Sequence, residues 1–145
     1  MLVHQILKSK AKSGVLTVSP STKVAAAAAI LAENKIGSVV VSGDGGKSAV
    51  GILSERDIVR ELAASGGACL EKPVSAYMTT ELVTCTSENS AQDLLTMMTE
   101  GRFRHMPVVE DGAMVGLVTL GDVVKAQLSE LAMEKEALQG MIMGH

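Results

Sequence analysis

The sequence predicts an α+β fold made of two β-α-β-β-α repeats that pack against each other about a pseudo-two-fold axis. The phrase VGILSERD at 50–57 returns as VGLVTLGD at 115–122. The longer segments Val15–Val41 and Leu82–Val108 align with each other in the same order of apolar and polar residues. A single repeat of about 50 residues has too little apolar surface to be comfortably stable alone, so the two repeats should pack against each other.

Each repeat is expected to begin with a short strand and an amphipathic helix. Val, Leu and Thr are frequent over Gly14–Ser19 and Leu82–Thr86, as they are in strands. The segment that follows in each repeat has apolar residues at the i, i+3, i+4, i+7 spacing of one helix face. These residues are Val24, Ala27, Ala28 and Leu31 in the first repeat and Ala91, Leu94, Leu95 and Met98 in the second. Thr22 and Asn89 are the expected N-caps.

A hairpin and a second helix complete each repeat. The turn sequences GDGG and EDGA lie between short apolar runs, a pattern typical of β-hairpins. The expected strand pairs are Ser38–Ser42 with Ala49–Leu53 and His105–Val109 with Met114–Val118. Helices are expected over Glu55–Ala64 and from Leu120 to about Glu130.

These elements divide the chain into a first repeat with its lead-in (1–66), a linker (67–73), a second repeat (74–130) and a helical tail (131–145). Ser, Gly and Pro between Ala63 and Pro73 predict a loop, and Val74–Met78 is expected to be a short helical lead-in. Apolar residues at 128, 131 and 138, with charged residues between them, predict an amphipathic helix in the tail. It either folds back on its own chain or contributes to a homodimer.

Four segments carry a resemblance to a known family: VSAYMT at 74–79, RHMPVV at 104–109, GILSERD at 51–57 and GLVTLGD at 116–122. Duplicated and spaced in this way, they resemble a tandem pair of cystathionine-β-synthase (CBS) domains, the regulatory unit often called a Bateman module. The resemblance covers nearly the whole chain. It implies that an adenosine ligand such as AMP, ADP, ATP, NAD or S-adenosylmethionine binds in clefts between the repeats without being transformed, and that the module forms a homodimer.

The doubled phrase itself predicts a nucleotide site. A glycine at the strand lets a ligand approach the backbone, and the following helix begins with amides that can face a phosphate. A hydroxyl at the helix start can donate to the ligand, and a carboxylate three residues later can accept from ribose hydroxyls. The candidate residues are Gly51, Ser54 and Asp57 in the first repeat and Gly116, Thr119 and Asp122 in the second. The S-x-x-D and T-x-x-D patterns equally describe capping boxes, in which the same groups bind the helix's own amides.

Positive charge is distributed unevenly between the repeats. Arg56 of the first phrase is replaced by Gly121 in the second, whereas Arg102, Arg104 and His105 occur in the second repeat. Our hypothesis is that some of these cationic residues line a shared phosphate region between the repeats, since arginine makes forked contacts with phosphate oxygens. The alternative is that they lie on the solvated surface.

The resemblance also implies adenine and ribose contacts from the strand before each first helix and from the first strand of each hairpin. The candidates there are Thr17, Ser38, Thr84, His105, Met106 and Pro107. Strand packing is the alternative role for each of them.

Composition excludes several other functions. A net charge of -3 gives no broad basic surface for nucleic acid, and Tyr77 and Phe103 are too few aromatic residues for base stacking. No apolar run is long enough to span a membrane, and the first residues lack the features of a signal peptide, so we expect a cytoplasmic protein. His4, His105 and His145 do not form a metal-site pattern.

We therefore expect neither an enzyme nor a protein with a catalytic cofactor. GDGGKS at 43–48 lacks the spacing of a phosphate-binding loop, and no nucleophile and base are paired in the sequence. The expected function is that of an adenosine-nucleotide sensor that acts on an unidentified protein target. The alternative is a degenerate CBS pair that dimerises or docks on a partner without binding nucleotide.

Overall fold

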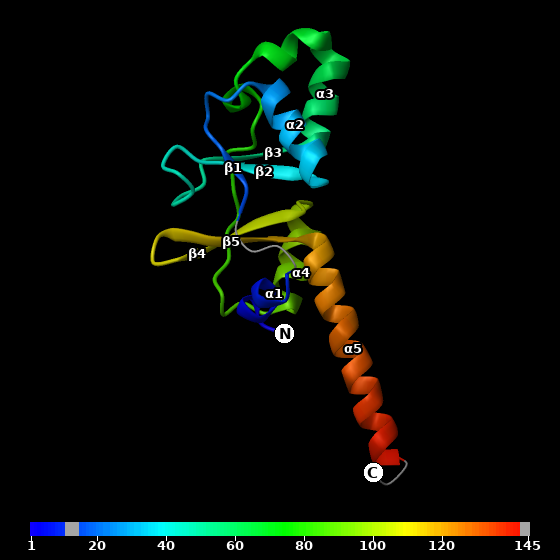
Figure 1. The fold of residues 1–145 in the computed structure, drawn as a ribbon. Helices are drawn as coiled ribbons and strands as arrows, with labels where there is room; N and C mark the ends of the chain where they lie inside the picture. Colours follow the sequence, from blue (N-terminus) through cyan, green and yellow to red (C-terminus); the bar gives the residue numbers. More distant parts are fainter. Residues whose placement is uncertain (11–14, 143–145) are drawn as a thin grey trace.

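Each repeat folds into a small sheet with helices, and the two halves lie one above the other in the computed structural model (Figure 1). The structure describes residues 1–10 and 15–142. The upper half in Figure 1 contains the first repeat, and the lower half contains the second. The α+β architecture of two repeats that the sequence predicts is confirmed.

The first half forms one sheet in the order β1-β2-β3. Strand β1 runs parallel to β2, and β2 pairs antiparallel with β3, so that Ser38 lies opposite Ser54 and Val41 lies opposite Gly51. Helices α2 and α3 bury Val24, Ala27, Leu31 and Ile58 against this sheet. The elements are β1 (Thr17–Val18), α2 (Val24–Asn34), β2 (Ser38–Val41), β3 (Gly51–Ser54) and α3 (Glu55–Ser65). The expected first strand began at Gly14, which lies outside the described residues.

The second half repeats this plan around β4 and β5, which pair antiparallel with an irregularity between Val108 and Val109. Its elements are α4 (Ala91–Gly101), β4 (His105–Glu110), β5 (Ala113–Thr119) and α5 (Leu120–Ile142). The strand expected over Leu82–Thr86 is wrong within the described residues, because the segment is reduced to one parallel bridge between Cys85 and Val108. Its first residues, Leu82 and Val83, line a cavity instead of extending the sheet.

The two expected N-caps are each wrong by one residue. Helix α2 has Lys23 at its N-cap with no side-chain hydrogen bond, and α4 has Ser90 there. The Ser90 hydroxyl accepts from the amide of Asp93, and the Asp93 carboxylate accepts from the amide of Ser90, both at 3.0 Å. Asn89 is not free to cap α4, because its side chain closes the preceding turn.

The connector between the halves is more ordered than the sequence suggests. Instead of a loop from Ala63 to Pro73, α3 continues to Ser65 and a 3-10 helix, η1 (Gly66–Glu71), follows. Cys69 in the middle of η1 is buried, which gives the connector an apolar anchor. The short helical lead-in is present as η2 (Val74–Ala76).

The two lead-in segments are exchanged between the halves. Helix α1 (Val3–Ser9) precedes the first repeat but buries Val3 and Ile6 in the core of the second. Conversely, η2 precedes the second repeat but buries Val74 in the core of the first. Equivalent backbone hydrogen bonds hold both: Val3 N–H donates to Asn89 at 2.9 Å and Val74 N–H donates to Thr22 at 2.8 Å. Because each lead-in is buried in the core of the other half, the exchange links the two halves.

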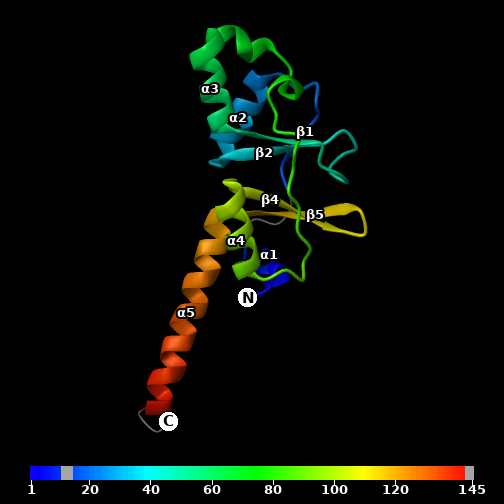
Figure 2. The same ribbon diagram turned by 180° about the vertical axis from the view of Figure 1, so that it is seen from behind.

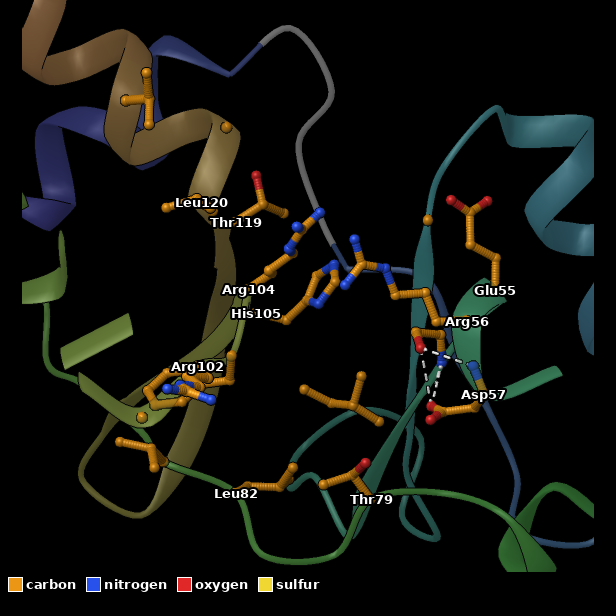
Figure 3. Close-up of a pocket in the computed structure, with 18 of the residues that line it drawn as sticks. Glu55, Arg56, Asp57, Thr79, Leu82, Arg102, Arg104, His105, Thr119 and Leu120 are labelled. Atoms are coloured by element: carbon orange, nitrogen blue, oxygen red, sulfur yellow. Dashed lines mark hydrogen bonds between the residues drawn. The ribbon is translucent and has the colours of Figure 1, made fainter. Parts of the chain in front are cut away.

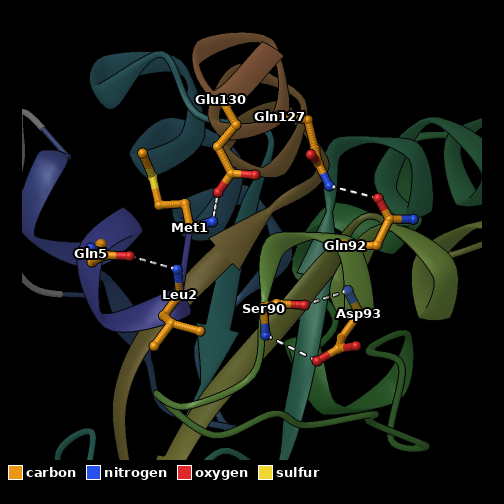
Figure 4. Close-up of polar contacts among 8 residues, drawn as sticks. All are labelled: Met1, Leu2, Gln5, Ser90, Gln92, Asp93, Gln127 and Glu130. Atoms are coloured by element: carbon orange, nitrogen blue, oxygen red, sulfur yellow. Dashed lines mark hydrogen bonds and ion pairs between the residues drawn. The ribbon is translucent and has the colours of Figure 1, made fainter. Parts of the chain in front are cut away.

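Further polar contacts fix the position of α1 (Figure 4). The amino group of Met1 pairs with Glu130 of α5, and the amide of Leu2 donates to the Gln5 side chain at 2.7 Å. Gln127 of α5 donates to Gln92 of α4 at 3.0 Å. The first residues of the chain and helices α4 and α5 are therefore joined as one unit.

Across the described ranges, 1–10 and 15–142, every helix is too short or too polar to span a bilayer.

Candidate functional site

A cavity of about 1250 Å³ lies between the two halves, and residues of both halves line it. Its walls come from the start of α3, the segment after η2, the turn from α4 to β4, and the start of α5. The polar and charged residues in this lining are Ser54, Glu55, Arg56, Asp57, Arg60, Thr79, Glu81, Arg102, Arg104, His105, Thr119 and Lys125. A volume of this size is enough for a nucleotide-sized ligand.

The doubled phrase begins α3 on one wall of the cavity. The hydroxyl of Ser54 accepts from the amide of Asp57 at 3.2 Å, and the Asp57 carboxylate accepts from the amide and hydroxyl of Ser54 at 2.9 and 3.0 Å. This is a complete capping box, as one of the two sequence interpretations proposed. The second carboxylate oxygen of Asp57 lies 3.6 Å from the guanidinium of Arg60.

The second copy of the phrase begins α5 with the same cap. The amide of Thr119 donates to Asp122 at 2.9 Å, and the amide of Asp122 donates to Thr119 at 3.2 Å. Here, however, the carboxylate also pairs with the ammonium of Lys10 at 2.9 Å, and Lys10 donates to the carbonyl of Leu117 at 2.8 Å. Asp122 is outside the cavity lining, so the two phrases are not equivalent.

Basic side chains from both halves converge in the cavity (Figure 3). His105, the first residue of β4, and Arg104, which precedes it, point into the cavity, and Arg56 points toward them from the start of α3. Arg102 lies nearby at the C-cap of α4, in the left-handed conformation with φ of 56°. Within the described ranges, the guanidinium groups of Arg56, Arg102 and Arg104 have no carboxylate within ion-pair distance.

The pKa of His105 is lowered from its usual value of 6.5. Burial is the largest cause, and the positive charge of Arg104 adds to it. The carboxylates of Asp57 and Asp122 act in the opposite direction, and Lys10 lowers the pKa slightly further. His105 is therefore held toward its neutral form.

Of the sequence-predicted site residues, the structure brings six to this cavity: Ser54, Arg56, Asp57, Arg104, His105 and Thr119. Arg102, which the phosphate hypothesis included, joins them. The others are outside the lining: Thr17, Ser38, Gly51, Thr84, Met106, Pro107, Gly116 and Asp122. Ser38, Met106 and Pro107 are buried within their own halves, and Thr84 is exposed.

The two glycines of the phrase have a packing role. A Cβ at Gly51 would lie 2.5 Å from the sulfur of Met78, and a Cβ at Gly116 would lie 2.8 Å from a methyl group of Leu7. Met78 and Leu7 both belong to the exchanged lead-ins. Each glycine therefore makes room for a side chain of the segment that crosses from the other repeat, in the space that the sequence interpretation gave to a ligand.

Sequence reasoning missed several residues of the lining. Arg60 follows Arg56 by four residues and so lies on the same face of α3, a signal that helix spacing contains. Lys125 stands at the position of Arg60 in the second repeat, which the repeat alignment could have shown. Thr79 and Glu81 follow the lead-in, and nothing in the sequence places that segment beside α3.

Comparison with known proteins identifies the family. The CBS domain model matches twice, at residues 6–64 and 74–129. The chain belongs to the CBS-domain family. The CBS domain-containing protein CBSX3 of Arabidopsis thaliana, described as mitochondrial, is 33% identical over 98% of this chain and 72% of its own length.

Solved CBS structures have the same fold. The CBS-domain containing protein ATU1752 from Agrobacterium tumefaciens is 41% identical, covers 88% of this chain and 99% of its own, and superposes with a TM-score of 0.82. The CBS domain pair of protein MJ0100 is 25% identical over 90% of this chain and 98% of its own, with a TM-score of 0.77. That structure is a complex with 5'-methylthioadenosine and S-adenosyl-L-methionine.

His, Cys, Asp and Glu side chains do not gather into a group suited to a metal ion anywhere in the described ranges. Cys69 and Cys85 are free thiols, both buried. Burial raises the pKa of the Cys85 thiol to about 11, and the neighbouring Glu110 carboxylate adds to this shift.

Proposed function

We propose that this CBS pair binds a phosphate-bearing adenosine nucleotide in the cavity between its halves and acts as a regulatory module without catalysis. The convergence of Arg56, Arg102 and Arg104 carries the proposal. Like charges repel one another, and each of these groups lacks an ion-pair partner within the described part of the chain. An anion placed among them would relieve that repulsion and accept forked hydrogen bonds.

The net charge of the lining supports an anionic ligand. Its described residues include the cations Arg56, Arg60, Arg102, Arg104 and Lys125 against the carboxylates Glu55, Asp57 and Glu81. The whole chain carries a net charge of -3, so the excess of positive charge is local to the cavity. The ligands in the MJ0100 structure are adenosine compounds without phosphate. For this chain we expect AMP, ADP, ATP or NAD to be preferred over such compounds.

The Asp57 carboxylate is the proposed ribose contact. One of its oxygens is engaged by Ser54, while the other lies 3.6 Å from Arg60 and retains lone pairs for hydroxyl donors. In the second phrase the Asp122 carboxylate is paired with Lys10 and is outside the lining, so we expect one working nucleotide site, at Asp57.

A ligand in this position touches both halves, so binding would favour one arrangement of the halves over others. We propose that this shift changes the affinity of the module for a partner protein in the cytoplasm. A homodimer is the assembly we expect.

Isothermal titration calorimetry with AMP, ADP, ATP, NAD, S-adenosylmethionine and 5'-methylthioadenosine tests the proposal. We expect the phosphate-bearing ligands to bind more tightly. Arg56→Gln and Arg104→Gln should each lower their affinity about 10- to 100-fold, the value of a charge-assisted hydrogen bond. Lys47→Gln is the matched control, because Lys47 is an exposed cation on the turn between β2 and β3. An equal loss in this control would contradict a local phosphate site.

One observation favours a second candidate function. The capping boxes at Ser54 and Thr119 are complete, and side chains of the exchanged lead-ins occupy the space beside Gly51 and Gly116. The doubled phrase therefore has a full structural explanation without a ligand. If none of the six compounds binds, the chain is better described as a CBS scaffold that docks on a partner.

A further inference from the structure

Helix α5 continues well beyond the body of the second half (Figures 1 and 2). The buried residues over its described length are Val123 and Ala126, and every residue from Leu131 to Gln139 is exposed. At about 1.5 Å per residue, the part after Ala126 is about 24 Å long. A lone helix of this length is marginally stable in water, and packing of an apolar face is what usually stabilises it.

Five of the seven large apolar residues that are exposed on α5 follow a heptad pattern, and Met133 and Met141 lie off it. Together with Lys135, the five recur at alternating intervals of four and three residues, the a and d spacing of a coiled coil. We call these positions the α5 seam: Val124, Leu128, Leu131, Lys135, Leu138 and Ile142. Its apolar members are between 41% and 84% exposed. Lys135 occupies an a position, where a polar residue fixes register at a cost in stability.

We propose that the α5 seam pairs with the α5 seam of a second copy of this chain in an antiparallel coiled coil. Core layers of an antiparallel pair join an a position to a d position. One register uses all six positions of each helix: Leu128 lies against Leu138 of the second copy, Leu131 against Lys135, and Val124 against Ile142. The seam is thus complementary to itself over 19 residues, from 124 to 142.

Charge selects the antiparallel orientation. A parallel pair would place Lys135 against Lys135 of the second copy, two like charges in an apolar layer. In the antiparallel register each Lys135 instead lies against Leu131 of the second copy. Its methylene groups then cover that leucine, and its ammonium can reach water at the edge of the seam.

The seam is continuous with the cavity between the halves. Val124 and Leu128 belong to the seam and also line the cavity. In the antiparallel register the last turn of α5 from the second copy reaches Val124 through Ile142. The second copy therefore contributes apolar surface beside the Val124 part of the cavity lining.

Sedimentation equilibrium of the purified full chain without nucleotide tests the proposal. We expect a dimer for the natural sequence, and a loss of dimer affinity of about 100-fold or more for Leu138→Glu, which places an unpaired charge against Leu128 of the second copy in two layers of the seam. Met133→Glu is the matched control, because Met133 is 54% exposed, close to the 59% of Leu138, but lies off the seam. A monomeric natural chain, or equal dimer affinity in the two variants, would overturn the proposal.

Two further measurements sharpen the test. Lys135→Leu should strengthen the dimer about tenfold or more, because it removes a charge from the seam. For orientation, chains carrying Leu128→Cys and chains carrying Leu138→Cys should form a disulfide when mixed, and neither should form one alone. Cys69 and Cys85 are buried and do not compete. Cross-linking of either variant with itself would overturn the antiparallel register, and circular dichroism verifies that each variant is folded.

Discussion

Alanine in place of Gly51 tests whether the exchanged lead-ins are required for stability. The new Cβ would lie 2.5 Å from the sulfur of Met78, 2.7 Å from its Cγ and 3.1 Å from its Cβ. Rotation can move the sulfur away, but the Cβ of Met78 is fixed to the backbone, so part of the clash remains. Overpacking of this kind costs about 1–3 kcal/mol, and we expect the free energy of unfolding to fall by that amount.

Urea denaturation followed by circular dichroism measures the effect. Gly43→Ala is the control, since a Cβ at Gly43 meets nothing within 4 Å and the expected change is below about 0.5 kcal/mol. The double variant with Met78→Ala should recover about 1–2 kcal/mol of the loss relative to the sum of the single changes, because the two sites are in direct contact. Strictly additive effects of the two substitutions would refute the contact between Met78 and Gly51.

Three further predictions concern the core and the titrating groups. Leu94→Ala should lower the free energy of unfolding in urea by about 2–5 kcal/mol, because Leu94 is fully buried, whereas Thr96→Ala on the exposed face should change it by less than about 0.5 kcal/mol. The pKa of Glu110 is lowered from 4.5 by hydrogen bonds from the hydroxyl and the amide of Ser87. The ionised Glu110 carboxylate therefore stabilises the folded protein above pH 4.5, and this stabilisation is lost as the pH falls through the folded pKa. Ser87→Ala should weaken this acid dependence, which thermal melts at a series of pH values would measure. The pKa of His105 is also lowered, and bound phosphate should raise it, so nucleotide affinity should increase as the pH falls from about 7.5 to about 5.5 and should lose this dependence in His105→Asn.

Much of the fold could be predicted because the same order of strand and helix patterns occurs in both repeats. The hairpin at Ser38–Ser54 is matched by the one at His105–Thr119, and the helix after each begins at the residue that the phrase indicates. The uneven distribution of arginine likewise indicated which side chains gather between the halves. A pattern that is repeated in the same order is a strong signal because both copies must satisfy the same packing.

The exchange of the lead-ins could not be predicted in this way. The sequence predicts a short helical lead-in that begins at Val74, but it does not show that Val74 is buried in the first half or that Val3 is buried in the second. The ion pair of Lys10 with Asp122 joins residues far apart in sequence, so no local pattern indicates it. As a result, Asp57 and Asp122 are equal candidates in the sequence. Only the tertiary structure shows that Asp57 lines the cavity while Asp122 is paired with Lys10 outside it.

The position of α1 has a consequence for synthesis of the chain. Val3 and Ile6 leave the ribosome before the residues that form the core that buries them, which lie between Cys85 and Ala126. The first half, in contrast, has its full set of core residues once Met78 has emerged. The first half can therefore fold before the second. A nascent chain that stalls during synthesis of the second repeat has a folded first half, while helix α1 still exposes its apolar face.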